Sequence, residues 1–189
     1  MMNGSIAVIM AGGKSSRMQQ DKALLPFGDA STLAEFQYER LGKFFSKVYL
    51  SAKSNKFNFD ANIIEDRYEA SSPLVALISV FETLEVNEVF VLSVDSPFVS
   101  EKVIAQLYDE AYAKADIVVA KSTQGLEPLC AIYRRSFLKS AYEALEKNNH
   151  RLQSLFETVT VLAVEITNKD AFLNLNYPSE YEEAKLKLI

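Results

Sequence analysis

The sequence is poor in the side chains that most often bind metals. Among its 189 residues are one cysteine, Cys130, and one histidine, His150. A single cysteine excludes an internal disulfide and a cysteine-only metal cage, and a single histidine excludes a site built from several histidines. Because no histidine lies near Cys130 in the sequence, we interpret this cysteine as a small core residue. Any metal chemistry must therefore use mainly oxygen ligands.

Long apolar runs and an excess of positive charge are absent as well. No uninterrupted apolar stretch approaches the ~18–20 residues of a membrane helix, and the N-terminal residues lack the basic region of a signal peptide. The 20 basic residues against 25 acidic ones give a net charge of −5, which disfavours nucleic-acid binding through bulk positive charge. We therefore expect a cytoplasmic protein that binds neither a membrane nor nucleic acid.

Length and residue pattern predict one α/β domain over residues 1–189. The chain fits the ~100–200 residues of a single domain, and short β-rich runs alternate with longer amphipathic stretches. This alternation predicts a mostly parallel sheet with helices on both faces. Ser72 and Ser100 are the expected N-caps of the second and third helices, with Pro73 at the first position of the second. We expect strands at 6–11, 47–51, 62–65, 89–94, 117–120, 129–133 and 159–164, and helices at 32–45, 73–84, 100–114, 137–147 and 179–188.

The two most apolar of these strands end in unusual polar sequence. The strand at 6–11 continues into Gly12 and Gly13, an adjacent pair in a chain with only six glycines. The strand at 89–94 continues into Asp95. Because parallel α/β sheets bind ligands at the carboxyl ends of their strands, these two strand ends mark the candidate site.

The glycine pair is typical of a loop that binds phosphate. Glycine removes the Cβ that would keep a ligand away from the backbone, and free N–H groups after a strand bind phosphate oxygens. Lys14, Arg17 and Lys22 follow closely, although a tight turn with solvated charges is the alternative. Neither common motif fits, because Val8 stands where a P-loop needs its first glycine and no third glycine follows the pair, as a dinucleotide fingerprint requires.

Asp95 is a candidate ligand for a divalent cation. A carboxylate at the end of a buried strand is suited to Mg²⁺, which prefers oxygen ligands and bridges phosphates. An Asx-type turn or a helix cap is the alternative role for the aspartate of an Asp-Ser-Pro sequence. The residues by themselves leave both roles open.

The sequence resembles the signature of the nucleotidyltransferases over residues 10–25, MAGGKSSRMQQDKALL. That signature has the form LAGG-x-S-x-R-M-G-x-D-K-x-L-L, so Met10 replaces a leucine and Gln19 a glycine. The double glycine and the pair Asp21 and Lys22 resemble the molybdenum cofactor guanylyltransferases in particular. The resemblance extends over nearly the whole chain and implies a three-layer, Rossmann-like nucleotidyltransferase fold.

The resemblance also implies roles for individual side chains. The glycine loop would hold a nucleotide triphosphate, and Asp95, in a segment similar to the family's D-[MT]-P-[FY], would bind magnesium. The implied catalytic residues are Arg17, Lys22 and Asp95. The implied nucleotide-binding residues are Met10, Ala11, Gly12, Gly13, Lys22, Ser51, Asp66 and Asp95, and the implied acceptor-binding residues are Arg151, Asn174 and Asn176.

The reaction that this resemblance implies is the transfer of GMP from GTP to the terminal phosphate of molybdopterin, with release of pyrophosphate. Mg²⁺ is the implied cofactor, and molybdenum-insertion and molybdoenzyme chaperone proteins are implied partners. The acceptor phosphate is already an anion, so the reaction needs no strong general base, in keeping with a single histidine. A transferase that uses CTP or another phosphorylated acceptor, and a non-catalytic nucleotide-binding protein of the same fold, are the alternatives.

Overall fold

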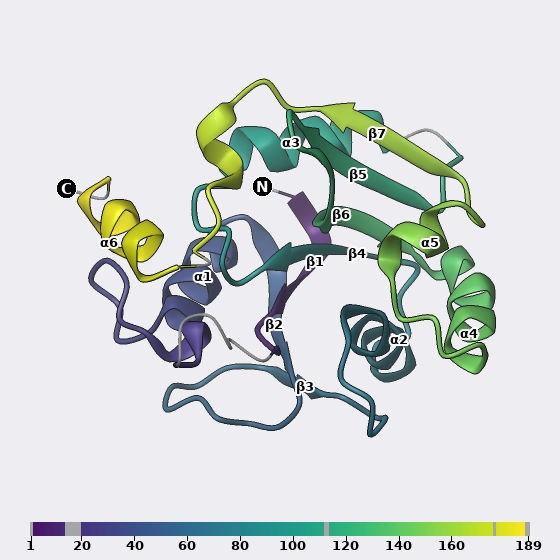
Figure 1. The fold of residues 1–189 in the computed structure, drawn as a ribbon, viewed down its shortest axis with the longest axis horizontal. Helices are drawn as coiled ribbons and strands as arrows, with labels where there is room; N and C mark the ends of the chain where they lie inside the picture. The colour runs from purple at the N-terminus through teal and green to yellow at the C-terminus, as the bar shows by residue number, and fades with distance from the viewer. Residues whose placement is uncertain (1, 14–19, 112–113, 176, 188–189) are drawn as a thin grey trace.

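A computed structural model describes residues 2–13, 20–111, 114–175 and 177–187 of the chain (Figure 1). Its strands are β1 (Met2–Met10), β2 (Phe45–Ala52), β3 (Ile63–Glu65), β4 (Glu88–Ser93), β5 (Ile117–Ser122), β6 (Gly125–Arg134) and β7 (Val161–Glu165). The α-helices are α1 (Leu33–Gly42), α2 (Pro73–Thr83), α3 (Glu101–Glu110), α4 (Leu138–Glu146), α5 (Leu152–Phe156) and α6 (Pro178–Leu186). Three short 3-10 helices accompany them: η1 (Lys22–Leu24), η2 (Arg135–Phe137) and η3 (Lys169–Phe172).

The strands form one sheet in the order β3-β2-β1-β4-β6-β5-β7. Every neighbouring pair is parallel except the two pairs that β6 makes, with β4 and with β5. The expected mostly parallel sheet is therefore confirmed. Among the described helices, none is long and apolar enough to cross a membrane.

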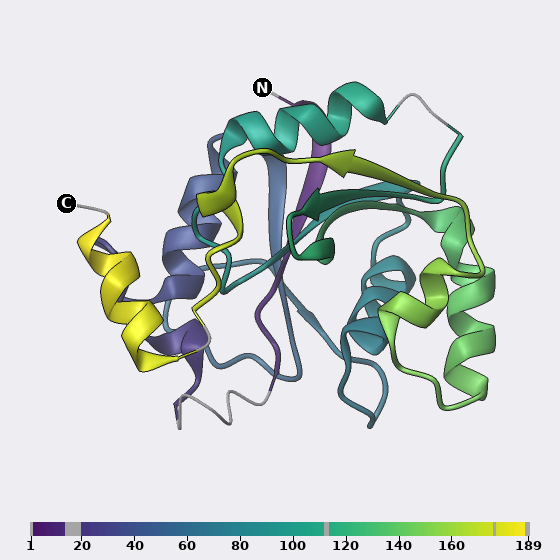
Figure 2. The ribbon, with the colours of Figure 1, turned by 45° about the horizontal axis from the view of Figure 1, so that its top comes forward.

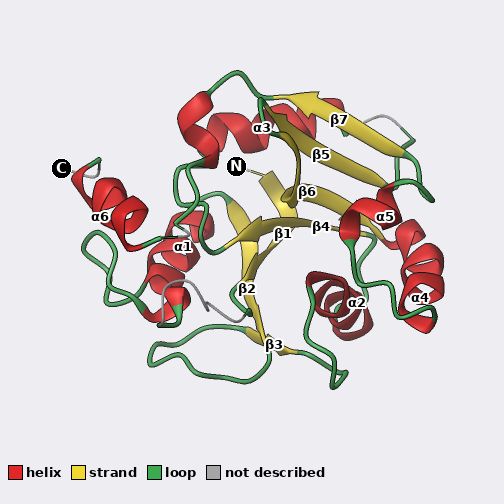
Figure 3. Cartoon of the chain, in the orientation of Figure 1, coloured by secondary structure: helices red, strands yellow, loops and turns green. Residues whose placement is uncertain are grey.

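Helices cover the sheet on both faces, which gives three layers (Figures 2 and 3). Side chains alternate along each strand, so Ile9 and Leu92 join a core with α1, α3 and α6, whereas Val8 and Val91 join a second core with α2, α4 and α5. Burial on both faces explains why residues 6–10 of β1 and 89–92 of β4 are continuous apolar runs in the sequence.

The start of α2 follows the sequence prediction. The hydroxyl of Ser72 accepts a hydrogen bond from the backbone N–H of Val75 at 3.2 Å, and Pro73 occupies the first turn of the helix. Ser100 likewise stands at the N-cap of α3, as predicted, but its side chain makes no capping hydrogen bond there. The α2 cap matters for the site, because Ser72 and Pro73 also line the cavity described below.

The antiparallel strand β6 forms a hairpin with β5. Only two residues separate the strands, and so short a connection cannot contain the crossover that parallel strands need. Cys130 lies on β6 with 2% of its surface exposed, and burial raises the pKa of its thiol. The interpretation of Cys130 as a core residue is confirmed.

Candidate functional site

The carboxyl ends of β1, β2 and β4 are joined by backbone hydrogen bonds that continue just beyond the strands. The N–H of Ala11 donates to the carbonyl of Ser51 at 2.9 Å, and the N–H of Val94 donates to the carbonyl of Met10 at 3.2 Å. The glycine pair and Asp95 follow directly in the sequence. The two strand ends singled out by their polar sequence therefore lie at one edge of the sheet.

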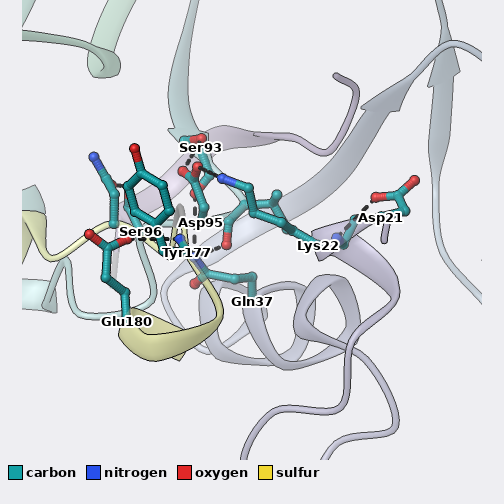
Figure 4. A network of polar contacts seen from close by, with 11 residues as sticks. Asp21, Lys22, Gln37, Ser93, Asp95, Ser96, Tyr177 and Glu180 are labelled. Atoms are coloured by element: carbon teal, nitrogen blue, oxygen red, sulfur yellow. Dashed lines mark hydrogen bonds and ion pairs between the residues drawn. The ribbon is translucent and has the colours of Figure 1, made fainter. Parts of the chain in front are cut away.

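Lys22 and Asp95 form an ion pair at this edge, although they are 73 positions apart in the sequence (Figure 4). The Nζ of Lys22 lies 2.9 Å from Oδ2 of Asp95, and the hydroxyl of Ser93 donates to Oδ1 of Asp95 at 2.6 Å. The two charged side chains are only 14% and 20% exposed. Partial burial reduces screening by solvent, so both charges act strongly on a ligand at this edge.

A buried polar pair on α1 supports the backbone around Asp95. Gln37 is fully buried, and its Nε2 donates to the carbonyl of Val94 at 3.3 Å. The Nε of Arg40 donates to Oε1 of Gln37 at 3.0 Å, and its guanidinium also donates to the carbonyl of Val99. Burial lowers the pKa of Arg40 to about 10, which leaves it charged at neutral pH. The sequence did not predict that Gln37 and Arg40 support the site. The one indication in the sequence is a glutamine on the apolar face of a helix.

A cavity of about 500 Å³ opens beside the glycine pair, within the size range of small-molecule sites. Gly13 has φ +132°, a conformation that other residues rarely adopt, so glycine is required there. The first turn of α2 forms another wall through Ser72 and Pro73. Of the expected nucleotide-binding residues, Met10, Gly12, Gly13, Ser51 and Asp66 line this cavity.

Two buried polar atoms at the cavity are available to a ligand. Among the residues that the structure describes, Oγ of Ser51 and Oδ1 of Asp66 lack a hydrogen-bond partner although they are buried. Buried polar atoms in native proteins are nearly always paired, and an orphan in a cavity wall is suited to bind a ligand. Both residues were expected near the nucleotide from the sequence.

Replacing Asp66 with asparagine should stabilise the ligand-free protein at neutral pH. Burial raises the pKa of Asp66 above its ordinary 3.8, with Lys53 opposing the shift. The folded state thus holds this proton more tightly than the unfolded chain, so ionised Asp66 destabilises the fold at pH values above its raised pKa. We expect Asp66→Asn to raise the melting temperature at pH 7 but not below pH 3.8. An equal gain at both pH values would contradict the assignment.

The expected acceptor-binding residues lie in different places. Oδ1 of Asn174 accepts a hydrogen bond from Ser96 at 2.8 Å, and the N–H of the next residue, Leu175, donates to the carbonyl of Asp95 at 3.2 Å. Asn174 is thus held beside Asp95. Arg151 is exposed at the N-cap of α5, outside the set of residues that line the cavity.

Three other residues of the sequence analysis, Lys14, Arg17 and Asn176, lie outside the described residues.

The comparisons with known proteins agree with this geometry. The model of the MobA-like NTP transferase domain matches residues 7–164. The chain belongs to this family. A molybdenum cofactor guanylyltransferase from Campylobacter jejuni subsp. doylei is 40% identical over 189 aligned residues, which cover 99% of this chain and 98% of that protein. One from Helicobacter pylori is 34% identical over 182 residues, covering 94% and 90%.

The fold of the MobA-like family is also evident in solved structures. The crystal structure of molybdopterin-guanine dinucleotide biosynthesis protein A from Archaeoglobus fulgidus superposes with a TM-score of 0.84 at 20% identity, covering 96% of this chain and 97% of that one. The expected three-layer nucleotidyltransferase fold is therefore confirmed.

MobA-like nucleotidyltransferases generally need a divalent metal, and the donor set here is compatible with one. Among the described residues, no group of three or more histidine, cysteine, aspartate or glutamate side chains could hold a metal by itself. Asp95 instead offers a single carboxylate next to a cavity. One carboxylate fits a hard cation that takes its other ligands from water and from substrate phosphates.

Proposed function

We propose that the protein transfers GMP from GTP to the terminal phosphate of molybdopterin and releases pyrophosphate. The observation that carries this proposal is the Lys22–Asp95 ion pair at the carboxyl edge of the sheet, where Asp95 accepts a hydrogen bond from Ser93, a residue that lines the glycine-lined cavity. The guanylyl specificity is supported by the 40% identity to a molybdenum cofactor guanylyltransferase over nearly the full length of both chains. We place the reaction in the cytoplasm, with molybdenum-insertion and molybdoenzyme chaperone proteins as the partners that supply the acceptor and receive the product.

In the proposed reaction an oxygen of the acceptor phosphate attacks the α-phosphorus of GTP. The new P–O bond forms as the bond between the α- and β-phosphates breaks, and pyrophosphate leaves with the bonding electron pair. No proton has to be removed from the acceptor, so catalysis depends on alignment and on neutralising negative charge. Lys22 and Arg17 supply the positive charge, lysine as a point charge and arginine through its planar fork.

The other residues in this proposal bind and orient the two substrates. The backbone at Gly12 and Gly13 faces the phosphates, while Ser51 and Asp66 use their unpaired oxygens on the nucleoside. Asp95 would hold Mg²⁺, which would supply charge neutralisation on the phosphates. The proposed acceptor contacts come from Arg151, Asn174 and Asn176.

A direct assay tests the proposed function. Purified protein is incubated with molybdopterin and each α-³²P-labelled nucleoside triphosphate in turn, and the labelled dinucleotide product is separated from free nucleotide. We expect product with GTP and Mg²⁺, and none when either molybdopterin or the metal is omitted. Product formed with CTP in preference to GTP would overturn the guanylyl assignment.

GTP should protect the protein from heat more than CTP or ATP does when Mg²⁺ is present. A ligand that binds only the folded state raises its melting temperature in proportion to the logarithm of concentration over Kd, so the preferred nucleotide gives the largest shift. Thermal unfolding with each nucleotide at one concentration measures this order, and samples with EDTA control for the metal. A shift with CTP as large as that with GTP would place the protein with the cytidylyltransferases.

A further inference from the structure

Lys56, in the loop between β2 and β3, makes two contacts that the proposed reaction does not use. Its Nζ donates to the backbone carbonyl of Ala11 at 2.9 Å and forms an ion pair with Oδ2 of Asp21. The lysine side chain is 24% exposed, and Nζ lies 5.6 Å from the ring centroid of Phe57. A half-buried lysine with these three contacts is held in one place, unlike a surface lysine in a solvated ion pair.

The two partners of Lys56 flank the phosphate-binding sequence. Ala11 directly follows β1 and precedes Gly12, and Asp21 directly precedes Lys22. Asp21 is also the N-cap of η1, since its Oδ1 accepts from the N–H of Ala23 at 3.1 Å. The ammonium group of Lys56 therefore links Ala11, which precedes the glycine pair, to Asp21, which precedes Lys22.

Charge gives Lys56 a second effect. Asp21 puts a negative charge next to Lys22, at a place where the proposed ligand is a multiply charged anion. Two unit charges about 4 Å apart interact strongly near a protein surface, where the effective dielectric constant is well below that of water. Unless a cation balances it, Asp21 repels the phosphates.

We propose that Lys56 is a positioning residue of the triphosphate site, which joins the glycine pair to the Lys22 turn and cancels the charge of Asp21. This inference rests on the proposed function, because it requires a nucleotide triphosphate bound beside Gly12, Gly13 and Lys22. Lys56 acts through Ala11 and Asp21 rather than on the substrate itself. The effect of Lys56 should therefore depend on the number of phosphates in the ligand and on the charge of residue 21.

The test compares binding of GTP, GDP and GMP to the full chain without metal, by isothermal titration calorimetry in EDTA. Lys56→Met removes the charge and keeps an unbranched apolar side chain of similar length. We expect this variant to bind GTP about tenfold more weakly, because the uncompensated charge of Asp21 repels the phosphates, and GMP no more than about twofold more weakly. GDP should fall between the two. The loss for GTP should shrink at high salt, because salt screens the uncovered charge of Asp21.

Asp21→Asn separates the electrostatic effect from a structural one. Asparagine keeps Oδ1 as the cap acceptor for Ala23 and removes the negative charge. In the Lys56→Met background it should restore most of the lost GTP affinity, and in the native background it should bind GTP at least as tightly as the unmodified protein. Weaker GTP binding by Asp21→Asn alone would overturn the proposal, and this variant remains informative even if Lys56→Met does not fold.

Arg134→Met is a matched control. Arg134 is also a half-buried cation, 23% exposed, that joins a carboxylate, Glu88, to a backbone carbonyl, that of Ala115. Glu88 lies at the amino end of β4, so this pair is at the opposite end of the strand from Asp95. We expect Arg134→Met to lower the melting temperature without changing the ratio of GTP to GMP affinity.

Two further results would overturn the proposal, and they differ in what they imply for the proposed function. Equal weakening of GTP and GMP by Lys56→Met, with no rescue by Asp21→Asn, would show that Lys56 has a general structural role, and the proposed function would stand. Unmodified protein that binds GTP no more tightly than GMP would remove the triphosphate site itself, and the proposed function with it.

Discussion

An Asp95→Asn enzyme should transfer no measurable GMP in the presence of Mg²⁺ while keeping its fold. Asparagine matches aspartate in size, and its Oδ1 can still accept a hydrogen bond from the hydroxyl of Ser93. In the native protein this hydroxyl donates to Oδ1 of Asp95 at 2.6 Å. The amide carries no charge, however, so it is a poor ligand for Mg²⁺, and its NH₂ group faces the ammonium of Lys22. Transfer of labelled GMP measures the activity, and circular dichroism with thermal unfolding measures the fold.

Asp116→Asn is a suitable control for this variant. Asp116 likewise accepts from a serine hydroxyl, that of Ser136, and its Oδ2 accepts from the N–H of Thr160 at 2.8 Å. It precedes β5, at the amino end of that strand and far from the carboxyl edge where the proposed site lies. The control should retain activity. An active Asp95→Asn enzyme would show that another group holds the metal.

The strand ends were predictable because each depends on local sequence. A strand covered on both faces must be apolar throughout, so the polar residues after β1 and β4 stand out, and the topology of a parallel sheet then requires these ends to share one edge. Ser72 and Pro73 mark the start of α2 for an equally local reason, since a capping hydroxyl and a proline both suit the first turn.

The supports of the site were not predictable, because they depend on residues far apart in the sequence. Gln37 reaches Val94 from 57 positions away, and Lys56 reaches Ala11 from 45 positions away. Neither contact has a periodic or motif signature, and a lysine in a polar loop is ordinarily a solvated side chain.

The antiparallel direction of β6 could have been inferred from its short connection to β5. The sequence did not predict helix α5, because its five residues are too few to show a helical repeat of apolar positions.

Ser100 shows where a local rule fails. It stands at the N-cap of α3 with an extended backbone, as the sequence predicted, yet its side chain does not accept the capping hydrogen bond. A serine before a helix is thus sufficient to predict where the helix begins but does not establish how its first N–H groups are bonded, since that depends on the rotamer of the side chain.

Replacing Lys22 with alanine should lower kcat by at least ~10²-fold, the cost typical of a lost electrostatic stabiliser. Lys22 begins η1 and is followed by Ala23, which is 1% exposed and anchors this turn in the core. The ammonium is thus held 2.9 Å from Asp95, where the proposed reaction would develop negative charge. A positioned cation acts mainly on that developing charge, so turnover should fall more than the affinity for GTP.

The matched variant for this prediction is Lys14→Ala, which removes a second lysine of the same signature. Lys14 lies between the glycine pair and two serines, without the apolar segment that follows Lys22, and its removal should cost much less in kcat. Steady-state kinetics with GTP as the varied substrate gives kcat and KM for both variants. Removing Lys22 also leaves Asp95 without its ion-pair partner, so an increase in KM should accompany the fall in kcat, because the uncompensated carboxylate repels the phosphates. Full activity in Lys22→Ala, or an equally severe loss in Lys14→Ala, would assign the catalytic charge to a different residue.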